Sequence, residues 1–177
     1  MKKTEKISLT ALFAAIGLVL PFLTGQIPVI GKMLLPMHLP VLLCGFICGA
    51  PYALPLGALL PVIRSLVFSA PPLYPDAAVM VFELAAYGFF SGFFYSRLKK
   101  QSVAGVYLCL AASMLAGRVI WGVAKAVMLG FGGSGFTVSA FLTVGFVQAI
   151  PGIVLQLVLI PALMFALDKT RLVPFKR

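Results

Sequence analysis

Acidic residues are scarce in this chain. Asp and Glu together number 4 among 177 residues, against 14 Lys and Arg, and charged residues make up 10% of the sequence. Soluble domains carry about 25% charged residues, so the composition excludes an ordinary water-soluble protein. Hydrophobic residues make up 62% of the chain. We therefore expect an all-α integral membrane protein that forms one membrane domain over residues 1–177.

Histidine occurs once, at His38, and cysteine three times. One histidine cannot form a His-rich metal site and makes a Ser/His/Asp nucleophile implausible. Cys44, Cys48 and Cys109 lie in apolar runs and are interpreted as packing residues. No P-loop and no paired Asp/Glu motif is present. We expect no enzyme activity, no cofactor and no bound metal, and any uphill movement of a solute would need energy from a partner.

Apolar runs between charge clusters and Gly/Pro breaks predict six transmembrane helices. The first run is too long for the apolar region of a cleaved signal peptide, so we expect it to remain as a helix. The second and third runs are broken by Gly and Pro in CGFICGAPYALPLGALLP, and a kinked or re-entrant second segment is the alternative. The expected helices lie near residues 8–25, 37–50, 52–69, 76–96, 103–129 and 138–167.

The basic residues fall into three clusters, which lie before the first expected helix, after the fourth and after the sixth. With six spans, all three clusters share one side of the membrane. The positive-inside rule makes that side cytoplasmic, together with both termini. The positive charge is thus a topology signal in a multi-pass plasma-membrane protein and does not indicate nucleic-acid binding. The clusters are Lys2, Lys3 and Lys6, then Arg97, Lys99 and Lys100, then Lys169, Arg171, Lys176 and Arg177.

A few ionisable residues fall inside the expected spans, where charges are expensive and usually functional. Arg64, Arg118 and Lys125 are basic, whereas Glu83 is the one acid at depth, with Asp76 near an outer end. This count leaves an excess of positive charge, and an uncompensated buried cation is costly. We therefore expect an anionic ligand. The alternative is structural: Arg64 pairs with Glu83, and Lys125 extends towards the surface.

Helical spacing places several of these residues together. Arg118, Trp121 and Lys125 share one face of the fifth helix with Gly122. Gln148 and, more deeply, Gln156 are expected on one face of the sixth helix.

Aromatic residues in the same region suit a small-molecule pocket. Tyr74, Tyr87 and Trp121 combine an apolar ring with a polar tip, as such pockets require. For Tyr74 the alternative is an aromatic residue at the membrane interface.

The segment from residue 33 to residue 92, with MLLPMHLPVLLCGFICGAPYALPLGALLP and LYPDAAVMVFELAAYGFFSG, resembles the S components of energy-coupling factor (ECF) vitamin transporters, especially the pantothenate group. The likeness covers about residues 5 to 100, and beyond that it rests on helix count. It implies a six-helix protein that captures a micronutrient at its outer face. It also implies a transmembrane coupling protein and two ATPase subunits as partners.

Two features of this family can be placed on the sequence. Its first helix typically carries an A-x-x-x-A surface for the coupling protein, which Ala11 and Ala15 supply here, and small residues at that spacing let helices approach closely. Its pocket is built from the outer loops and the outer halves of the last three helices. The expected substrate-binding residues are Arg64, Tyr74, Glu83, Tyr87, Arg118, Trp121, Lys125 and Gln148.

The sequence therefore predicts an S component for a small anionic vitamin or precursor, with pantothenate as the first candidate. Arg118 and Lys125 would bind the carboxylate, Gln148 the amide or hydroxyl groups, and Tyr87 and Trp121 the apolar part. Glu83 would accept a hydrogen bond from a substrate hydroxyl or hold Arg64 in place.

Several alternatives remain open. Pyridoxal phosphate is the nearest rival as substrate, since its phosphate suits the same cations. Met37-His38 matches the Met-His pair of nickel and cobalt S components, but it is internal here, and divalent metals of this type need more ligands. We expect His38 to cap a helix or to face the pocket mouth. A membrane scaffold and an intramembrane enzyme are the more distant alternatives.

Overall fold

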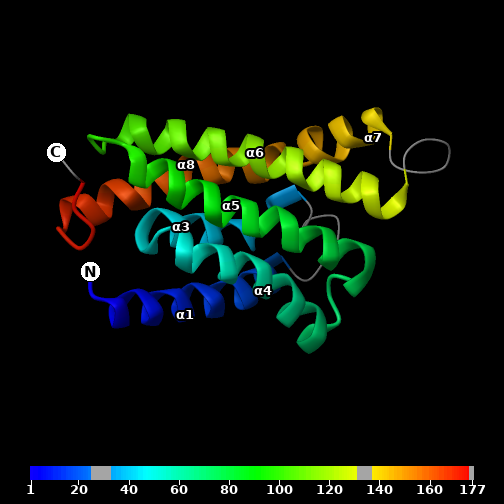
Figure 1. The fold of residues 1–177 in the computed structure, drawn as a ribbon, viewed down its shortest axis with the longest axis horizontal. Coiled ribbons are helices and arrows are strands. Elements are labelled where there is room, and N and C mark those ends of the chain that lie inside the picture. Colours follow the sequence, from blue (N-terminus) through cyan, green and yellow to red (C-terminus); the bar gives the residue numbers. More distant parts are fainter. Residues whose placement is uncertain (25–32, 131–136, 176–177) are drawn as a thin grey trace.

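The computed structural model describes residues 1–24, 33–130 and 137–175, and their regular structure is helical throughout, as predicted. The helices lie roughly along one long axis (Figure 1). The long helices are α1 (Lys3–Val19), α4 (Ala50–Phe68), α5 (Ala78–Arg97), α6 (Val103–Leu129) and α8 (Ile150–Lys169). The short ones are η1 (Leu20–Thr24), α3 (His38–Cys48), η2 (Leu73–Ala77), α7 (Val138–Leu142) and η3 (Thr143–Val147).

Five helical segments of the described chain are long and apolar enough to cross a membrane, against the six that the sequence predicts. The predicted second span, 37–50, is the 11-residue helix α3. At a rise of 1.5 Å per residue, such a helix covers about half of a hydrocarbon layer of about 30 Å. Gly49 follows its last residue, and the φ of 93° there favours glycine. The short helix α3 fits the kinked or re-entrant alternative better than a full span.

The predicted final helix over 138–167 is interrupted. A π-helical turn, η3, follows α7, and a turn at Gln148 and Ala149 precedes α8. Pro151 lies in the first turn of α8, where its missing N–H is tolerated, but inside a continuous helix it would remove a backbone hydrogen bond. The interruption breaks the common face expected of two glutamines: Gln148 is exposed, whereas Gln156 is buried.

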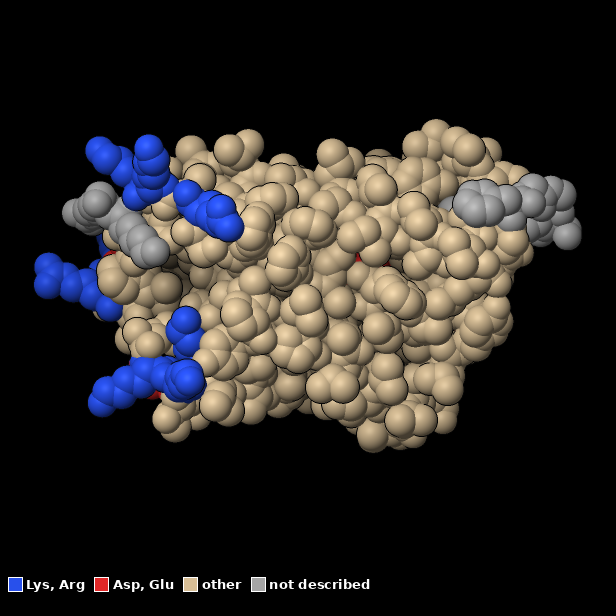
Figure 2. Space-filling model, in the orientation of Figure 1, with Lys and Arg blue, Asp and Glu red and all other residues tan. Residues whose placement is uncertain are grey.

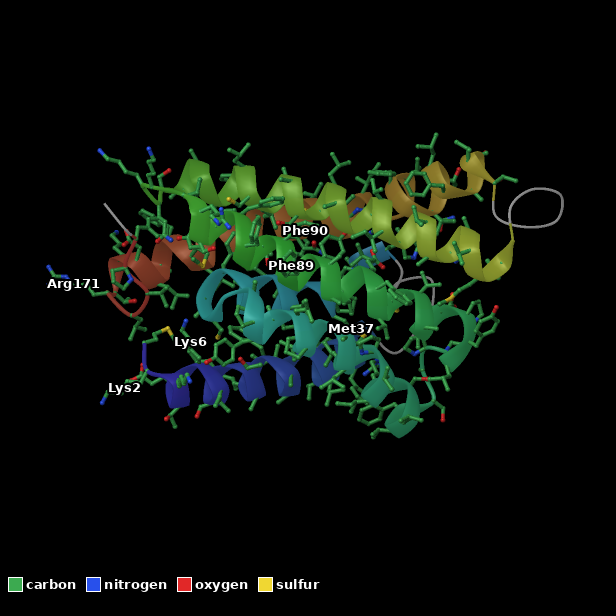
Figure 3. The ribbon with its side chains drawn as sticks, viewed as in Figure 1. Lys2, Lys6, Met37, Phe89, Phe90 and Arg171 are labelled. Carbon is green, nitrogen blue, oxygen red and sulfur yellow. The ribbon has the colours of Figure 1, made fainter. Side chains whose placement is uncertain are left out.

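The N-terminus, the C-terminus and the α5–α6 connection lie at one end of the molecule (Figure 1). Lys and Arg side chains gather at that end in the space-filling view (Figure 2). Lys2, Lys6 and Arg171 mark it in Figure 3. The described residues of the three basic clusters thus share one end, called the basic end below, whereas Lys176 and Arg177 lie outside the described residues. Its cytoplasmic placement stays a prediction from the positive-inside rule.

Helix α3 occupies the interior of the bundle, where it packs against α1, α4, α5 and α8. Most of its residues are buried, and Met37, just before it, lies inside the bundle (Figure 3). Glycines let the α4 and α5 backbones approach closely: a Cβ on Gly57 would lie 2.2 Å from the Leu84 carbonyl oxygen. Because α3 is short, its first residue, His38, lies within the bundle rather than at its surface.

Candidate functional site

A buried ion pair joins α5 to α6 inside the bundle. Arg118 Nη1 donates a hydrogen bond of 2.9 Å to Glu83 Oε1. The two residues are only 4% and 2% exposed. A buried ion pair needs good geometry and further hydrogen bonds to offset its desolvation. The side chains around this pair therefore form the candidate site.

His38 reaches the same carboxylate from α3. Its Nε2 lies 3.2 Å from Glu83 Oε1, although the geometry is not that of an aligned hydrogen bond. The His38 ring also meets the Tyr87 ring edge-on, with centroids 5.1 Å apart. No side-chain capping bond is made at the start of α3. His38 is therefore part of the buried polar cluster, and the expected cap is not formed.

The predicted polar face of α6 is confirmed. The Arg118 guanidinium lies 5.9 Å from the Trp121 ring centroid, and Lys125 Nζ lies 5.2 Å from it. Lys125 Nζ is also 3.9 Å from Asp76 Oδ1, in η2. Helical spacing alone was enough to predict this face, because residues three, four and seven apart lie on one side of a helix.

Glycines make room for the aromatic rings around this cluster. A Cβ on Gly117 would lie 2.9 Å from Tyr87 Cε1, and one on Gly122 would lie 2.4 Å from Phe141 Cε2. The Phe141 ring stacks on Trp121, with centroids 6.0 Å apart. Phe141 belongs to α7, so this segment covers Trp121 on α6.

The excess of positive charge expected from the sequence is not found in this cluster. Arg118 and Lys125 carry two positive charges, and Glu83 and Asp76 carry two negative ones, so these four residues are neutral together. The sequence count failed because it set Asp76 aside as a residue at an outer end. The structure brings its carboxylate to Lys125 instead.

Three of the predicted substrate-binding residues lie apart from the Glu83–Arg118 pair. Arg64 is buried, but its Nη1 donates to the Leu18 carbonyl oxygen at 2.7 Å, not to Glu83 as the structural alternative proposed. The Tyr74 hydroxyl donates to the Met128 carbonyl oxygen at 2.8 Å, and Tyr74 is 63% exposed. Gln148 is exposed as well. The remaining five predicted residues lie in or beside the cluster: Glu83, Tyr87, Arg118, Trp121 and Lys125.

Several buried polar atoms have no hydrogen-bond partner among the described residues. They are Nε and Nη2 of Arg118, both ring nitrogens of His38, both amide atoms of Gln156 and the hydroxyl of Tyr95. Such groups are rare in folded proteins and are often explained by a ligand or water. Helical spacing predicts Gln156 on the same face as Gln148, although only Gln148 is among the predicted site residues. The greater expected depth of Gln156 in its span is the signal for its burial.

An apolar groove of about 330 Å³ runs between α1 and α4. Ala11 and Ala14 line it, together with Leu18 from α1 and Pro55 from α4. Ala15, the other residue of the predicted partner surface, is exposed on α1. The groove is separate from the Glu83–Arg118 pair, which lies between α5 and α6.

Metal ligands do not cluster in the part of the chain that the structure describes. No group of three or more His, Cys, Asp or Glu residues lies close enough there to hold a metal ion. His38, the residue on which the nickel or cobalt alternative depends, instead contacts Glu83.

A comparison with protein-family models shows which family the chain belongs to. The family model described as "ECF transporter, substrate-specific component" matches residues 5–164. The chain belongs to this family. The match extends beyond residues 5 to 100, where the sequence resemblance was recognised, and it includes α6 and most of α8. Neither the curated proteins nor the solved structures contain a match to the chain.

As an ECF S component, the protein is a multi-pass cell-membrane transporter subunit and not an enzyme. S components pair with an energy-coupling module, so the missing P-loop has a simple explanation. The family assignment does not name the substrate.

Proposed function

We propose that this S component captures a small acidic vitamin or vitamin precursor, with pantothenate as the first candidate. The observation that carries the proposal is the buried Arg118, which has two nitrogens without a hydrogen-bond partner among the described residues. Buried N–H donors of a guanidinium suit an acceptor-rich ligand, above all a carboxylate. Because the charges around Arg118 are balanced, a singly charged acid is less costly to bury there than a doubly charged phosphate.

The surroundings of Arg118 match the other parts of pantothenate. Trp121 and Tyr87 offer apolar ring surface for its dimethyl group. On α8, the buried Gln156 has both an amide donor and an acceptor without a partner among the described residues, which suits an amide of the ligand. In the proposed site Gln156 would take the role predicted for Gln148. Lys125 would lie at the outer end of the site, beside Asp76.

The solute would enter from the end of the molecule opposite the basic end. Arg118 lies about 17 Å from the outer end of α6 on a rise of 1.5 Å per residue, so a bound solute would lie well inside the bundle. A transmembrane coupling protein and two ATPase subunits would then drive its release on the other side, as the resemblance to ECF vitamin transporters implies.

Titration calorimetry with pantothenate on the purified protein tests this proposal. Arg118→Met removes the charge and keeps apolar bulk, and loss of one partner of a buried charge pair costs about 2 to 5 kcal/mol. We expect the dissociation constant to rise about thirtyfold or more. Lys125→Met should have a smaller effect, because Lys125 is less buried and lies beside Asp76.

Lys99→Met, at the exposed basic end, is the matched control and should bind like the parent. Mass spectrometry of any ligand released from the purified parent identifies the solute independently. Unchanged binding by both the Arg118 and the Lys125 variants would contradict the acidic-solute proposal and indicate a neutral ligand.

A further inference from the structure

We propose that one edge of the Arg118 guanidinium, formed by Nε and Nη2, is the carboxylate-binding element of this S component. In this proposal Glu83 is a positioning residue that orients the guanidinium and does not itself contact the substrate. The inference rests on the proposed function, because it assumes that the solute is a small acid. It goes further by assigning the atoms that bind the carboxylate and by giving Glu83 a different role from the predicted one.

The hydrogen bonding of Arg118 divides its guanidinium into a used and an unused part. Nη1 donates to Glu83 Oε1 at 2.9 Å. Nε and Nη2 have no partner among the residues that the structure describes. In a planar guanidinium, Nε–H and one N–H of Nη2 point in parallel, and this pair of donors matches the two oxygens of a carboxylate. The unused edge is thus the one that binds a carboxylate with two parallel hydrogen bonds.

Burial makes it costly to leave the donors of this edge without a hydrogen-bond partner. Arg118 is 4% exposed, so water does not freely satisfy its donors. A buried donor without a partner costs the free energy of its lost hydration. Nη1 has a carboxylate partner from the protein itself. The two remaining nitrogens are those that a ligand would satisfy.

The contacts of Glu83 are those of a residue that fixes an orientation. Its Oε1 lies within reach of both Arg118 Nη1 and His38 Nε2, on α6 and α3 respectively. The Trp121 ring lies 5.9 Å from the guanidinium carbon. A guanidinium held by a carboxylate and flanked by an indole loses little freedom on binding, and such preorganisation increases affinity.

Charge decides between a carboxylate and a phosphate. The four residues Asp76, Glu83, Arg118 and Lys125 are neutral together, and Lys125 already faces Asp76. A phosphate ester brings nearly two negative charges, whereas a carboxylate brings one. Because uncompensated buried charge is costly, the site favours the carboxylate.

Titration calorimetry on the purified full-length chain, with matched pairs of probes, tests the proposal. Three pairs consist of an acid and a neutral relative: pantothenate with pantothenol, nicotinate with nicotinamide, and biotin with biotinamide. The fourth pair is pyridoxal 5′-phosphate with pyridoxal. The measured quantity is the ratio of the two affinities within a pair. Misfolding lowers both affinities, but it does not selectively remove a preference for the acid.

The parent should bind at least one carboxylate about tenfold or more tightly than its neutral relative. Arg118→Lys keeps the charge but removes the parallel pair of donors, and it should lower that ratio about tenfold. Arg97→Lys, at the basic end of α5, makes the same chemical change away from the site. It should leave the ratio unchanged.

Two neutral replacements of Glu83 test the positioning role. Glu83→Gln keeps an acceptor oxygen for Nη1, whereas Glu83→Leu removes it. Both lose the same negative charge, so the difference between them isolates the acceptor. The ratio should stay within about threefold of the parent value in the Gln variant and fall about fivefold further in the Leu variant, a difference that corresponds to about 1 kcal/mol.

Each contrary result has a distinct meaning. If the parent binds none of the four pairs, the proposed function fails, and this inference fails with it. If the parent prefers a carboxylate and Arg118→Lys keeps that preference, the edge assignment alone is wrong. Equal ratios in the Gln and Leu variants would reject the positioning role of Glu83. A preference for pyridoxal 5′-phosphate over every carboxylate would overturn the choice of a carboxylate.

Discussion

Arg64 and Arg118 are both buried in an apolar bundle, yet different groups stabilise them. Arg118 has the carboxylate of Glu83. Arg64 has the Leu18 carbonyl oxygen, and the Phe22 and Phe68 rings lie 5.2 Å and 5.5 Å from its guanidinium carbon. Leu18 is in the last turn of α1, where carbonyl groups lack helical partners. Arg64 therefore ties the end of α1 to α4, whereas Arg118 ties α5 to α6 and belongs to the proposed solute site.

This difference predicts that Arg64 is not a substrate-binding residue, although the sequence analysis included it as one. Arg64→Met should change the dissociation constant for pantothenate less than about threefold, whereas Arg118→Met raises it about thirtyfold or more. Calorimetry of the two variants side by side makes the comparison. A loss of affinity in Arg64→Met as large as in Arg118→Met would return Arg64 to the site.

Among the helices, glycines bring the backbones of α4 and α5 into direct contact. A Cβ on Gly57 would lie 2.2 Å from the Leu84 carbonyl oxygen, and one on Gly88 would lie 2.4 Å from the Ala53 carbonyl oxygen. Both obstacles are backbone atoms, which cannot move aside as a side chain can. Helix α5 also carries Glu83, so this interface holds the helix that contributes the buried carboxylate.

Gly57→Ala should therefore destabilise the protein by about 1 to 3 kcal/mol, the usual cost of overpacking a core. Thermal unfolding in detergent measures the effect. Gly105→Ala is the control, because a Cβ there meets the flexible end of the Leu98 side chain and alanine favours a helix. Equal stability of the Gly57 variant and the parent would show that the two helices separate easily.

Helical periodicity predicted what lies within one element but not what lies between elements. The face shared by Arg118, Trp121 and Lys125 followed from spacing alone. The pairing of Glu83 with Arg118 did not, because it depends on how α5 packs against α6. Nor did sequence show that α3 is short enough to place His38 inside the bundle.

A break in the last predicted helix explains why its two glutamines differ in burial. A hydropathy reading treats 138–167 as one helix, because prolines occur inside membrane helices. The break before Pro151 separates Gln148 from Gln156, so one is exposed and the other buried. Only the packing of α8 against the other helices shows which of the two glutamines is buried.

In the whole molecule, the proposed solute site and the proposed partner surface are separate. The cluster of His38, Glu83 and Arg118 lies among α3, α5 and α6, whereas Ala11 lies in the apolar groove between α1 and α4. Ala15 is exposed on the same helix. This separation would let the coupling protein bind without covering the solute.

Replacing Ala11 or Ala15 with Trp should accordingly block assembly with the coupling protein and the ATPases, because a large ring prevents close helix approach. Solute affinity should stay within about threefold of the parent value. Copurification with tagged ATPase subunits measures assembly. Val123→Trp, at an exposed position on α6, is the matched control and should assemble normally. Normal copurification of both alanine variants would rule out this surface.

Uptake of radiolabelled pantothenate into proteoliposomes tests whether the chain supplies the solute site while its partners supply the energy for transport. One preparation contains the chain alone, and the other contains the chain with its coupling protein and ATPases, each with and without ATP inside. We expect accumulation above the external concentration only in the complete complex with ATP, and its loss in that complex with Arg118→Met. Accumulation by the chain alone without ATP, or full uptake by the Arg118→Met complex, would contradict it.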